Sequence, residues 1–250
     1  KDILQSEKKG KIIISDGTTN IHPVWSPSGE RFAYLSNKDN DYFGQTDLFV
    51  YNFSDSTSEK IAGGVKTAPT WVDDSTLVYT KHSKPNKRGS KYFDLYRYTF
   101  SDEEEQRLTY NSRLISPVYN KNLNNIAAIT SYDGTSNIMI SRNVDITQDT
   151  LTFGAVTQLD NGIQLLSLAW SGNTLLVDGV YHQGRQIYKV DLDAGELELV
   201  SSGRWENRDQ IISSDGMIYV SDKSGINNLV FEKNGKQDYI TNVTGGAFMP

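Results

Sequence analysis

The sequence predicts an all-β protein, a β-propeller of four-stranded blades. Three observations support this prediction: a unit that recurs every 40 to 51 residues, turn residues between the short apolar runs of each unit, and the lack of a convincing helical period. A period of this size with four strands per unit is typical of propellers. We expect five complete blades within the 250 residues and partial blades at both ends.

Each unit begins with its innermost strand, strand a, which we align on one anchor residue. An aromatic residue follows the anchor by two positions in four of the five units, and we expect it to fill the wedge between neighbouring blades. The anchors are Pro23, Pro69, Pro117, Leu168 and Gln210, with Pro250 at the start of the partial unit that follows, and the aromatic residues are Trp25, Trp71, Tyr119 and Trp170.

A hairpin turn containing Gly, Asn or Asp follows each strand a, because these residues tolerate positive φ. Strand b is expected at 31–35, 76–80, 125–130, 174–180 and 217–221. Strand c is expected at 47–52, 94–98, 137–141, 186–191 and 228–232, and strand d at 59–62, 106–109, 155–159, 196–200 and 238–241. The acidic trio 103–105 is interpreted as a solvated turn between strands c and d.

The repeats predict one propeller domain over residues 1–250, with blades at about 18–65, 66–112, 113–162, 163–203 and 204–246. Residues 3–5 and 11–15 resemble strands c and d of a preceding blade, and 244–250 resemble the start of a further strand a. An open ring would expose a core face and a sheet edge. We therefore expect a fragment of a longer chain whose intact ring has six or seven blades.

Composition excludes several functions. The chain carries 25 basic and 31 acidic residues, a net charge of −6, whereas a nucleic-acid-binding protein presents a basic face. No apolar run reaches the 18 residues of a membrane span. The absence of cysteine excludes disulfides, thiolate metal sites and a cysteine nucleophile.

Several segments resemble the TolB-like propeller repeat of bacterial proteins, which is related to WD-repeat propellers. These segments are the Pro-x-Trp/Tyr strands, the turn and strand at 26–36, the strand-c starts at 46–51 and 93–98, and the joint at 107–112. The resemblance implies a six- or seven-bladed propeller with a non-catalytic role, often within a periplasmic, outer-membrane-associated or secreted protein. It implies no catalytic residues and no cofactor.

The candidate catalytic and metal-ligating residues show no pattern of a site. His22, His82 and His182 come from three blades, and we expect surface or capping histidines rather than metal ligands. The aspartates lie nearly all in turns, so we expect neither a carboxylate pair of glycosidase type nor a calcium site in the loop 39–41. The sequence therefore predicts no catalytic residue, no metal and no cofactor.

The irregular connections favour a binding face. In a four-stranded blade the loop from strand b to strand c (b–c loop) and the joint from strand d to the next strand a (d–a joint) emerge on one face. Exposed aromatic and arginine residues are typical of binding hot spots. The candidate binding residues on this face are Tyr42, Phe43, Arg88, Tyr110, Arg113 and Trp205. The alternative is that Tyr110 and Trp205 pack between blades and the long loops are tolerated insertions.

The prediction for function is a scaffold that binds a protein or peptide partner, with a glycan as a further option, and that acts with the remainder of its own longer chain. Two alternatives stay open: an accessory or gating propeller of a peptidase or hydrolase, and a carbohydrate-active propeller.

Overall fold

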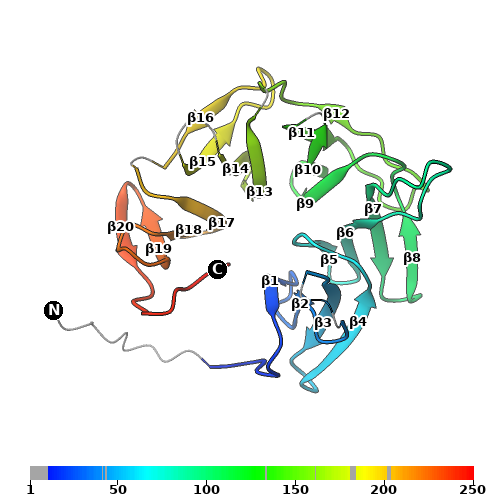
Figure 1. Cartoon of the computed structure of the whole chain (residues 1–250), viewed down its shortest axis with the longest axis horizontal. Helices are drawn as coiled ribbons and strands as arrows, with labels where there is room; N and C mark the ends of the chain where they lie inside the picture. Colours follow the sequence, from blue (N-terminus) through cyan, green and yellow to red (C-terminus); the bar gives the residue numbers. More distant parts are fainter. Residues whose placement is uncertain are drawn as a thin grey trace.

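The structure is a computed structural model that describes residues 11–40, 42, 44–132, 134–160, 162–180, 184–201 and 204–250. It confirms the predicted propeller: five four-stranded antiparallel sheets follow one another around a central axis in chain order (Figure 1). In every blade the first strand in the chain lies innermost and the fourth outermost. The described residues contain only strands and connections, and no helix among them is long and apolar enough to cross a membrane.

The blades have the following strands. Blade one holds β1 (Asn20–Trp25), β2 (Arg31–Ser36), β3 (Asp47–Asn52) and β4 (Thr57–Ala62). Blade two holds β5 (Thr70–Asp73), β6 (Thr76–His82), β7 (Phe93–Thr99) and β8 (Glu104–Arg107). Blade three holds β9 (Leu114–Asn120), β10 (Asn125–Tyr132), β11 (Thr135–Ser141) and β12 (Gly154–Ala155). Blade four holds β13 (Gln164–Ser171), β14 (Thr174–Val180), β15 (Arg185–Val190) and β16 (Leu197–Leu199). Blade five holds β17 (Asn207–Ser213), β18 (Gly216–Ser221), β19 (Asn228–Lys233) and β20 (Lys236–Tyr239).

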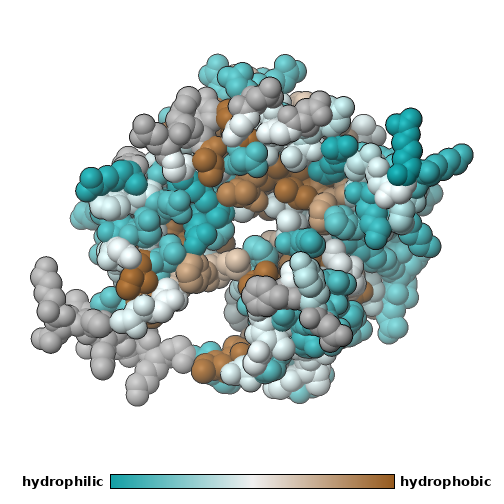
Figure 2. All heavy atoms as spheres, viewed as in Figure 1, coloured by the Kyte–Doolittle hydropathy of each residue, from teal (hydrophilic) through white to brown (hydrophobic). Residues whose placement is uncertain are grey.

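Apolar side chains of the middle strands join blades one to five in sequence, and hydrophobic residues also lie along the upper edge of the central opening in Figure 2. The strand-a tryptophans add a polar link between blades. The indole Nε1 of Trp71 donates to the carbonyl of Val24 in blade one at 3.0 Å. The indole of Trp170 donates to the carbonyl of Val118 in blade three at 3.2 Å. These bonds satisfy the one polar atom of a large apolar ring at the blade interface.

Trp25 departs from this pattern. Its side chain is 59% exposed, whereas Trp71, at the same place in blade two, is 6% exposed. Figure 1 shows no sheet between blade five and blade one, whose innermost strand carries Trp25. The C-terminal segment lies near this position, since Met249 Sδ accepts a bond from the His22 amide at 3.4 Å. The expectation that Trp25 fills a wedge between two blades is therefore wrong for the described residues.

A β-bulge interrupts strand a beside its anchor residue. The register between β1 and β2 shifts between Ile21 and Val24, which places Pro23 where the missing amide hydrogen breaks no ladder bond. The residues just before the anchors in blades one, three and five have positive φ: His22 at 54°, Ser116 at 51° and Asp209 at 53°. Met249, just before Pro250, repeats this conformation with φ 55°.

Four expected details differ from the structure. Residues 11–15 and 244–250 form no strand, because neither segment pairs with a sheet edge in the described residues, and residues 3–5 lie outside them. The acidic residues Glu104 and Glu105 belong to β8 rather than to a turn, since their backbone pairs with Tyr98 and Thr99. Strand d of blade three covers only Gly154–Ala155.

Candidate functional site

The antiparallel order of each blade brings the b–c loops and the d–a joints to one end of the propeller. Of the six residues predicted to form a binding face, three gather on blades two and three: Arg88, Tyr110 and Arg113. Tyr42 lies in the b–c loop of blade one, and Trp205 precedes blade five. Phe43 lies outside the described residues.

Arginines and tyrosines stack on one another where blade two meets blade three. The guanidinium of Arg107 lies over the ring of Tyr110, 4.3 Å from its centroid. The guanidinium of Arg113 lies 4.7 Å from the ring centroid of Tyr92 and 5.1 Å from that of Tyr132. Tyr110 and Tyr132 are nevertheless 60% and 61% exposed. We call these five residues the tyrosine–arginine patch.

Arg88 belongs to the same surface. It lies in the loop between β6 and β7, which projects from the rim of the ring (Figure 1). Hydrogen bonding to Arg113 and to Ser90 holds the pKa of the Tyr92 phenol below its usual range, and the charge of Arg88 contributes in the same direction. The patch is therefore positively charged at its centre.

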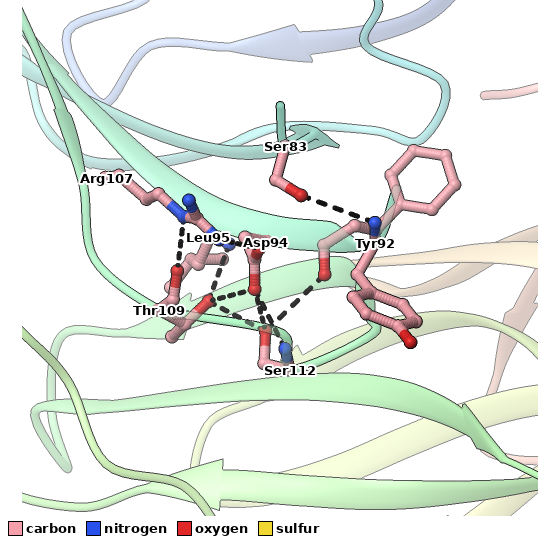
Figure 3. Close-up of polar contacts among 8 residues, drawn as sticks. Ser83, Tyr92, Asp94, Leu95, Arg107, Thr109 and Ser112 are labelled. Carbon is pink, nitrogen blue, oxygen red and sulfur yellow. Dashed lines mark hydrogen bonds and ion pairs between the residues drawn. The ribbon is translucent and has the colours of Figure 1, made fainter. Parts of the chain in front are cut away.

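A buried carboxylate supports the d–a joint that carries Tyr110 and Arg113. Asp94, at the start of β7, is fully buried and pairs with Arg107 at 2.6 Å (Figure 3). Its Oδ1 accepts bonds from the amide of Ser112 at 2.8 Å and from the Ser112 hydroxyl at 2.9 Å. The Thr109 hydroxyl also donates to Oδ1, at 3.3 Å, and accepts from the Leu95 amide at 2.9 Å. Charge-assisted bonds of this kind fix the path of the joint.

The same device recurs in other blades and explains two repeated sequence features. Asn137 and Asn228, at the same place in strand c, each accept a bond from the hydroxyl of a threonine that follows strand d. That hydroxyl accepts in turn from the next strand-c amide, Ile138 in blade three and Leu229 in blade five. The Asp or Asn at the start of strand c and the threonine after strand d are thus hydrogen-bonded to each other in these blades.

The joint in blade two also contains strained backbone. Asn111 and Arg113 both have φ 56°, in the left-handed region that residues other than glycine seldom adopt. Asparagine tolerates this region, but arginine does so only when its surroundings hold it there. The bonds of Asp94 to the intervening Ser112 provide that restraint, so the Arg113 side chain leaves the joint in a fixed direction.

Tyr42 and Trp205 do not join the patch. Tyr42 is 73% exposed in the loop that precedes β3. Trp205 is half-buried, with Arg204 4.9 Å from its ring centroid, and it lines a small pocket of about 100 Å³ with Tyr219 and Tyr239. Of the six predicted residues, Arg88, Tyr110 and Arg113 thus lie on the connections of blades two and three, whereas Tyr42 and Trp205 lie on other blades.

Sequence reasoning missed Tyr92, Arg107 and Tyr132. Each lies at or beside the end of a strand, and each comes from a different segment, so no local spacing connects them. The available signal was indirect: Tyr92 and Tyr132 flank b–c loops, and Arg107 stands three residues before Tyr110 in the d–a joint.

A second polar cluster lies among the inner strands of blades four and five. Arg185 pairs with Asp178 at 2.8 Å and with Asp209 at 2.9 Å. Asp178 is fully buried and also accepts bonds from the amides of Ser167 at 2.9 Å and Asp209 at 2.6 Å. The two carboxylates are balanced by Arg185 and by Arg208, 3.8 Å from Asp209. This balance indicates a structural role. Asp178 lies in β14, within the strand expected at 174–180.

His22 lies beside this cluster. Burial lowers the pKa of His22, Asp209 opposes that shift, and Arg185 adds to it. The unfolded chain, with the ordinary pKa of 6.5, therefore takes up the proton first as the pH falls. The stability that His22 contributes is complete above pH 6.5 and is lost as the pH falls toward its folded-state pKa.

We expect His22→Asn to flatten the decline in the free energy of unfolding between pH 7 and pH 5. Asparagine suits this position because it tolerates the φ of 54°. Urea unfolding at several pH values measures the effect. His82→Gln is the comparison, since burial and the charges of Lys66 and Lys91 lower the pKa of His82 on another blade. Equal slopes for wild type and His22→Asn would contradict the assignment.

The aspartates of the turns bond to their own backbone. Asp16, Asp55 and Asp145 each accept bonds from the amide and hydroxyl of a threonine two residues on, which lowers their pKa. This is ordinary Asx-turn chemistry. Within the described ranges no three His, Cys, Asp or Glu side chains stand close enough to hold a metal ion. His22 and His82 lie in separate surroundings, and His182 is outside those ranges.

Comparisons with known proteins support the fold and leave the family open. Neither the protein-family models nor the curated proteins contain a match to the chain. Among solved structures, a candidate TolB from Agrobacterium tumefaciens has a TM-score of 0.69 at 14% identity, covering 94% of this chain and 85% of that one. TolB from Acinetobacter baumannii has a TM-score of 0.67 at 13% identity, and it is matched over 95% of this chain, which spans 58% of that structure. The β-propeller domain of the Trilobed protease from Pyrococcus furiosus has a TM-score of 0.57 at 14% identity over 90% of this chain and 71% of that one. At these identities the chain is shown to have a TolB-like propeller fold.

Proposed function

We propose that the chain is a non-catalytic propeller module of a larger bacterial envelope or secreted protein, and that it binds a protein or peptide partner through the tyrosine–arginine patch. The observation that carries the proposal is a set of exposed tyrosines held in place by stacked arginines over a fully buried carboxylate. Tyrosine and arginine are the residues most enriched in binding hot spots, after tryptophan. The envelope location rests on the resemblance of the repeats to the TolB-like family.

The mechanism is rigid display. Apolar contacts hold blade two against blade three, with Leu95 and Ile126 fully buried between them. The Asp94 contacts then fix the joint that carries Tyr110 and Arg113. Ordering a long side chain on binding costs about 0.5–1.5 kcal/mol of conformational entropy. An arginine that is already stacked on a ring in the free protein loses less of this entropy when the partner binds.

The proposal is tested by selecting random peptides displayed on phage against the immobilised protein. We expect clones that bind wild type and that bind the double variant Tyr110→Ala/Arg113→Gln about tenfold more weakly, because two central contacts are lost. The matched control is Lys121→Ala/Lys236→Ala, which removes two exposed cations from the opposite face. The control should bind the clones as wild type does.

Thermal unfolding of both variants establishes that they are folded. If folded Tyr110→Ala/Arg113→Gln binds every selected clone as tightly as wild type does, the patch is not the binding site. If the selected clones instead bind the control variant more weakly than wild type, the binding site lies on the face of the a–b and c–d turns.

An accessory propeller of a peptidase is the second candidate, because the protease propeller domain named above has the same fold at 90% coverage of this chain. This candidate predicts that the protein as it occurs in the cell cleaves fluorogenic peptides and that residues 1–250 alone do not. Absence of cleavage by both would exclude it.

A further inference from the structure

The positive charge around the tyrosine–arginine patch is unusual for an acidic chain. The net charge is −6. Six cations nevertheless gather on the connections of blades one to three, and none of them forms an ion pair with a described residue. These cations are Lys66, Lys84, Lys87, Arg88, Lys91 and Arg113.

Four of these cations act on two neighbouring residues, His82 and Tyr92, and Lys84 and Lys87 belong to the loop that joins them. The charges of Lys66 and Lys91 both act on His82, which stacks on Phe93 at a centroid distance of 4.0 Å. Arg88 and Arg113 both act on Tyr92, the residue just before Phe93. The cluster therefore extends along the segment 82–93, from Lys66 after blade one to Arg113 before blade three.

Several cations elsewhere are neutralised locally. Lys60 pairs with Asp47 at 2.6 Å, and Lys81 pairs with Glu105 at 2.5 Å. Lys233 lies 3.5 Å from Asp215. Arg107, inside the patch, is neutralised by Asp94. Other described cations, Lys121 and Lys236 among them, also form no ion pair. The cations around the patch differ in density, because residues 82–93 contain four of them and no Asp or Glu.

We infer that the partner of the patch is an acidic protein segment, rich in Asp and Glu, that lies across the loop 83–92 and the joint 108–113. This inference rests on the proposed function and names the chemistry of its partner. Charge complementarity carries it: a carboxylate bonds strongly to a guanidinium, and an arginine stacked on tyrosine still presents its N–H edge. Arg113 and Arg88 are the expected carboxylate ligands. Arg107 is not, because its charge is already matched by Asp94.

The tyrosines provide the second half of recognition. Tyr110 on the joint and Tyr132 beside the Arg113 guanidinium are both exposed, so apolar side chains interspersed among the acids of the segment have rings to pack on. A purely electrostatic surface would need no such rings. An acidic segment also gains from long-range attraction to the patch, which is strongest at low salt.

The test uses a fluorescein-labelled twelve-residue peptide of Glu, Tyr and Leu, and a matched peptide in which every Glu is Gln. Fluorescence anisotropy with wild-type protein should show that the Glu peptide binds at least about tenfold more tightly than the Gln peptide, and that added salt weakens its binding. The double variant Arg88→Ala/Arg113→Gln should lose about tenfold in affinity for the Glu peptide. The control variant Lys121→Ala/Lys236→Ala should bind as wild type does.

Equal binding of the Glu and Gln peptides, or wild-type affinity of folded Arg88→Ala/Arg113→Gln, would overturn the inference. An oligogalacturonate that binds through Arg88 and Arg113 where the Glu peptide does not would also overturn it, in favour of an acidic glycan. The failures are distinguishable. Patch-dependent phage clones without acidic residues leave the proposed function standing and remove this inference, whereas the absence of patch-dependent clones removes the proposed function itself.

Discussion

Replacing Trp71 with alanine is expected to lower the free energy of unfolding by about 3–5 kcal/mol. The indole is 6% exposed, its Nε1 donates to Val24 of the preceding blade at 3.0 Å, and its ring stacks on Phe100 at a centroid distance of 5.6 Å. Removing it leaves a cavity between two blades and an acceptor without its donor. Urea unfolding followed by circular dichroism measures the change.

Trp25→Ala is the matched control, since Trp25 occupies the same strand position in blade one. Its ring stacks on Phe53 at 5.3 Å, but the side chain is 59% exposed. We expect a loss of about 1 kcal/mol, because most of the ring is already in water. Equal losses for the two variants would show that the wedge between blades one and two does not account for the role of Trp71.

Replacing Arg185 with methionine is the second large effect, with an expected loss of about 3–5 kcal/mol. Asp178 is fully buried, and Arg185 is the only cation paired with it among the described residues. The variant leaves that carboxylate buried without its counter-charge. Lys189→Ala is the control: Lys189 and Glu198 are 4.0 Å apart and both largely exposed, so its loss should stay below about 0.5 kcal/mol.

A double variant separates charge from packing. Asp178→Asn removes the charge and keeps one acceptor oxygen, which can retain the bond from the Ser167 amide or the bond from the Asp209 amide, since these donate to different carboxylate oxygens. We therefore expect Arg185→Met/Asp178→Asn to be more stable than Arg185→Met alone. Losses that simply add would contradict the view that the uncompensated carboxylate causes the effect.

The repeats predict the fold well because each blade contains its own short apolar runs for the strands and its own Gly, Asn or Asp residues for the turns. The edges are less predictable, since a strand exists only where a neighbour pairs with it. Glu104 and Glu105 pair with β7 despite their charge, and residues 11–15 have suitable residues but form no strand. Trp25 illustrates the same limit: its sequence context matches Trp71, and only the three-dimensional arrangement shows that its face is open.

The sequence indicated which face carries the candidate site and which residue types form it, but not which residues contact one another there. Blade topology places Arg88, Tyr110 and Arg113 on the face of the b–c loops and d–a joints. Nothing local in the sequence indicates that Arg113 reaches both Tyr92 and Tyr132, because both tyrosines are about 20 residues away in the chain and Tyr92 belongs to the preceding blade. The repeated Asp/Asn of strand c was recognised as a family feature, but its role in holding the joint emerges only from its hydrogen bonds.

The central claim is that the tyrosine–arginine patch and the cations around it form one binding site. Hydrogen exchange measured by mass spectrometry, with and without the Glu peptide, tests it most directly. We predict slower exchange in the loop 83–92 and the joint 108–113, and unchanged exchange in the turns 121–124 and 234–235 on the opposite face. Protection confined to those turns, or to the inner strands, would contradict the claim.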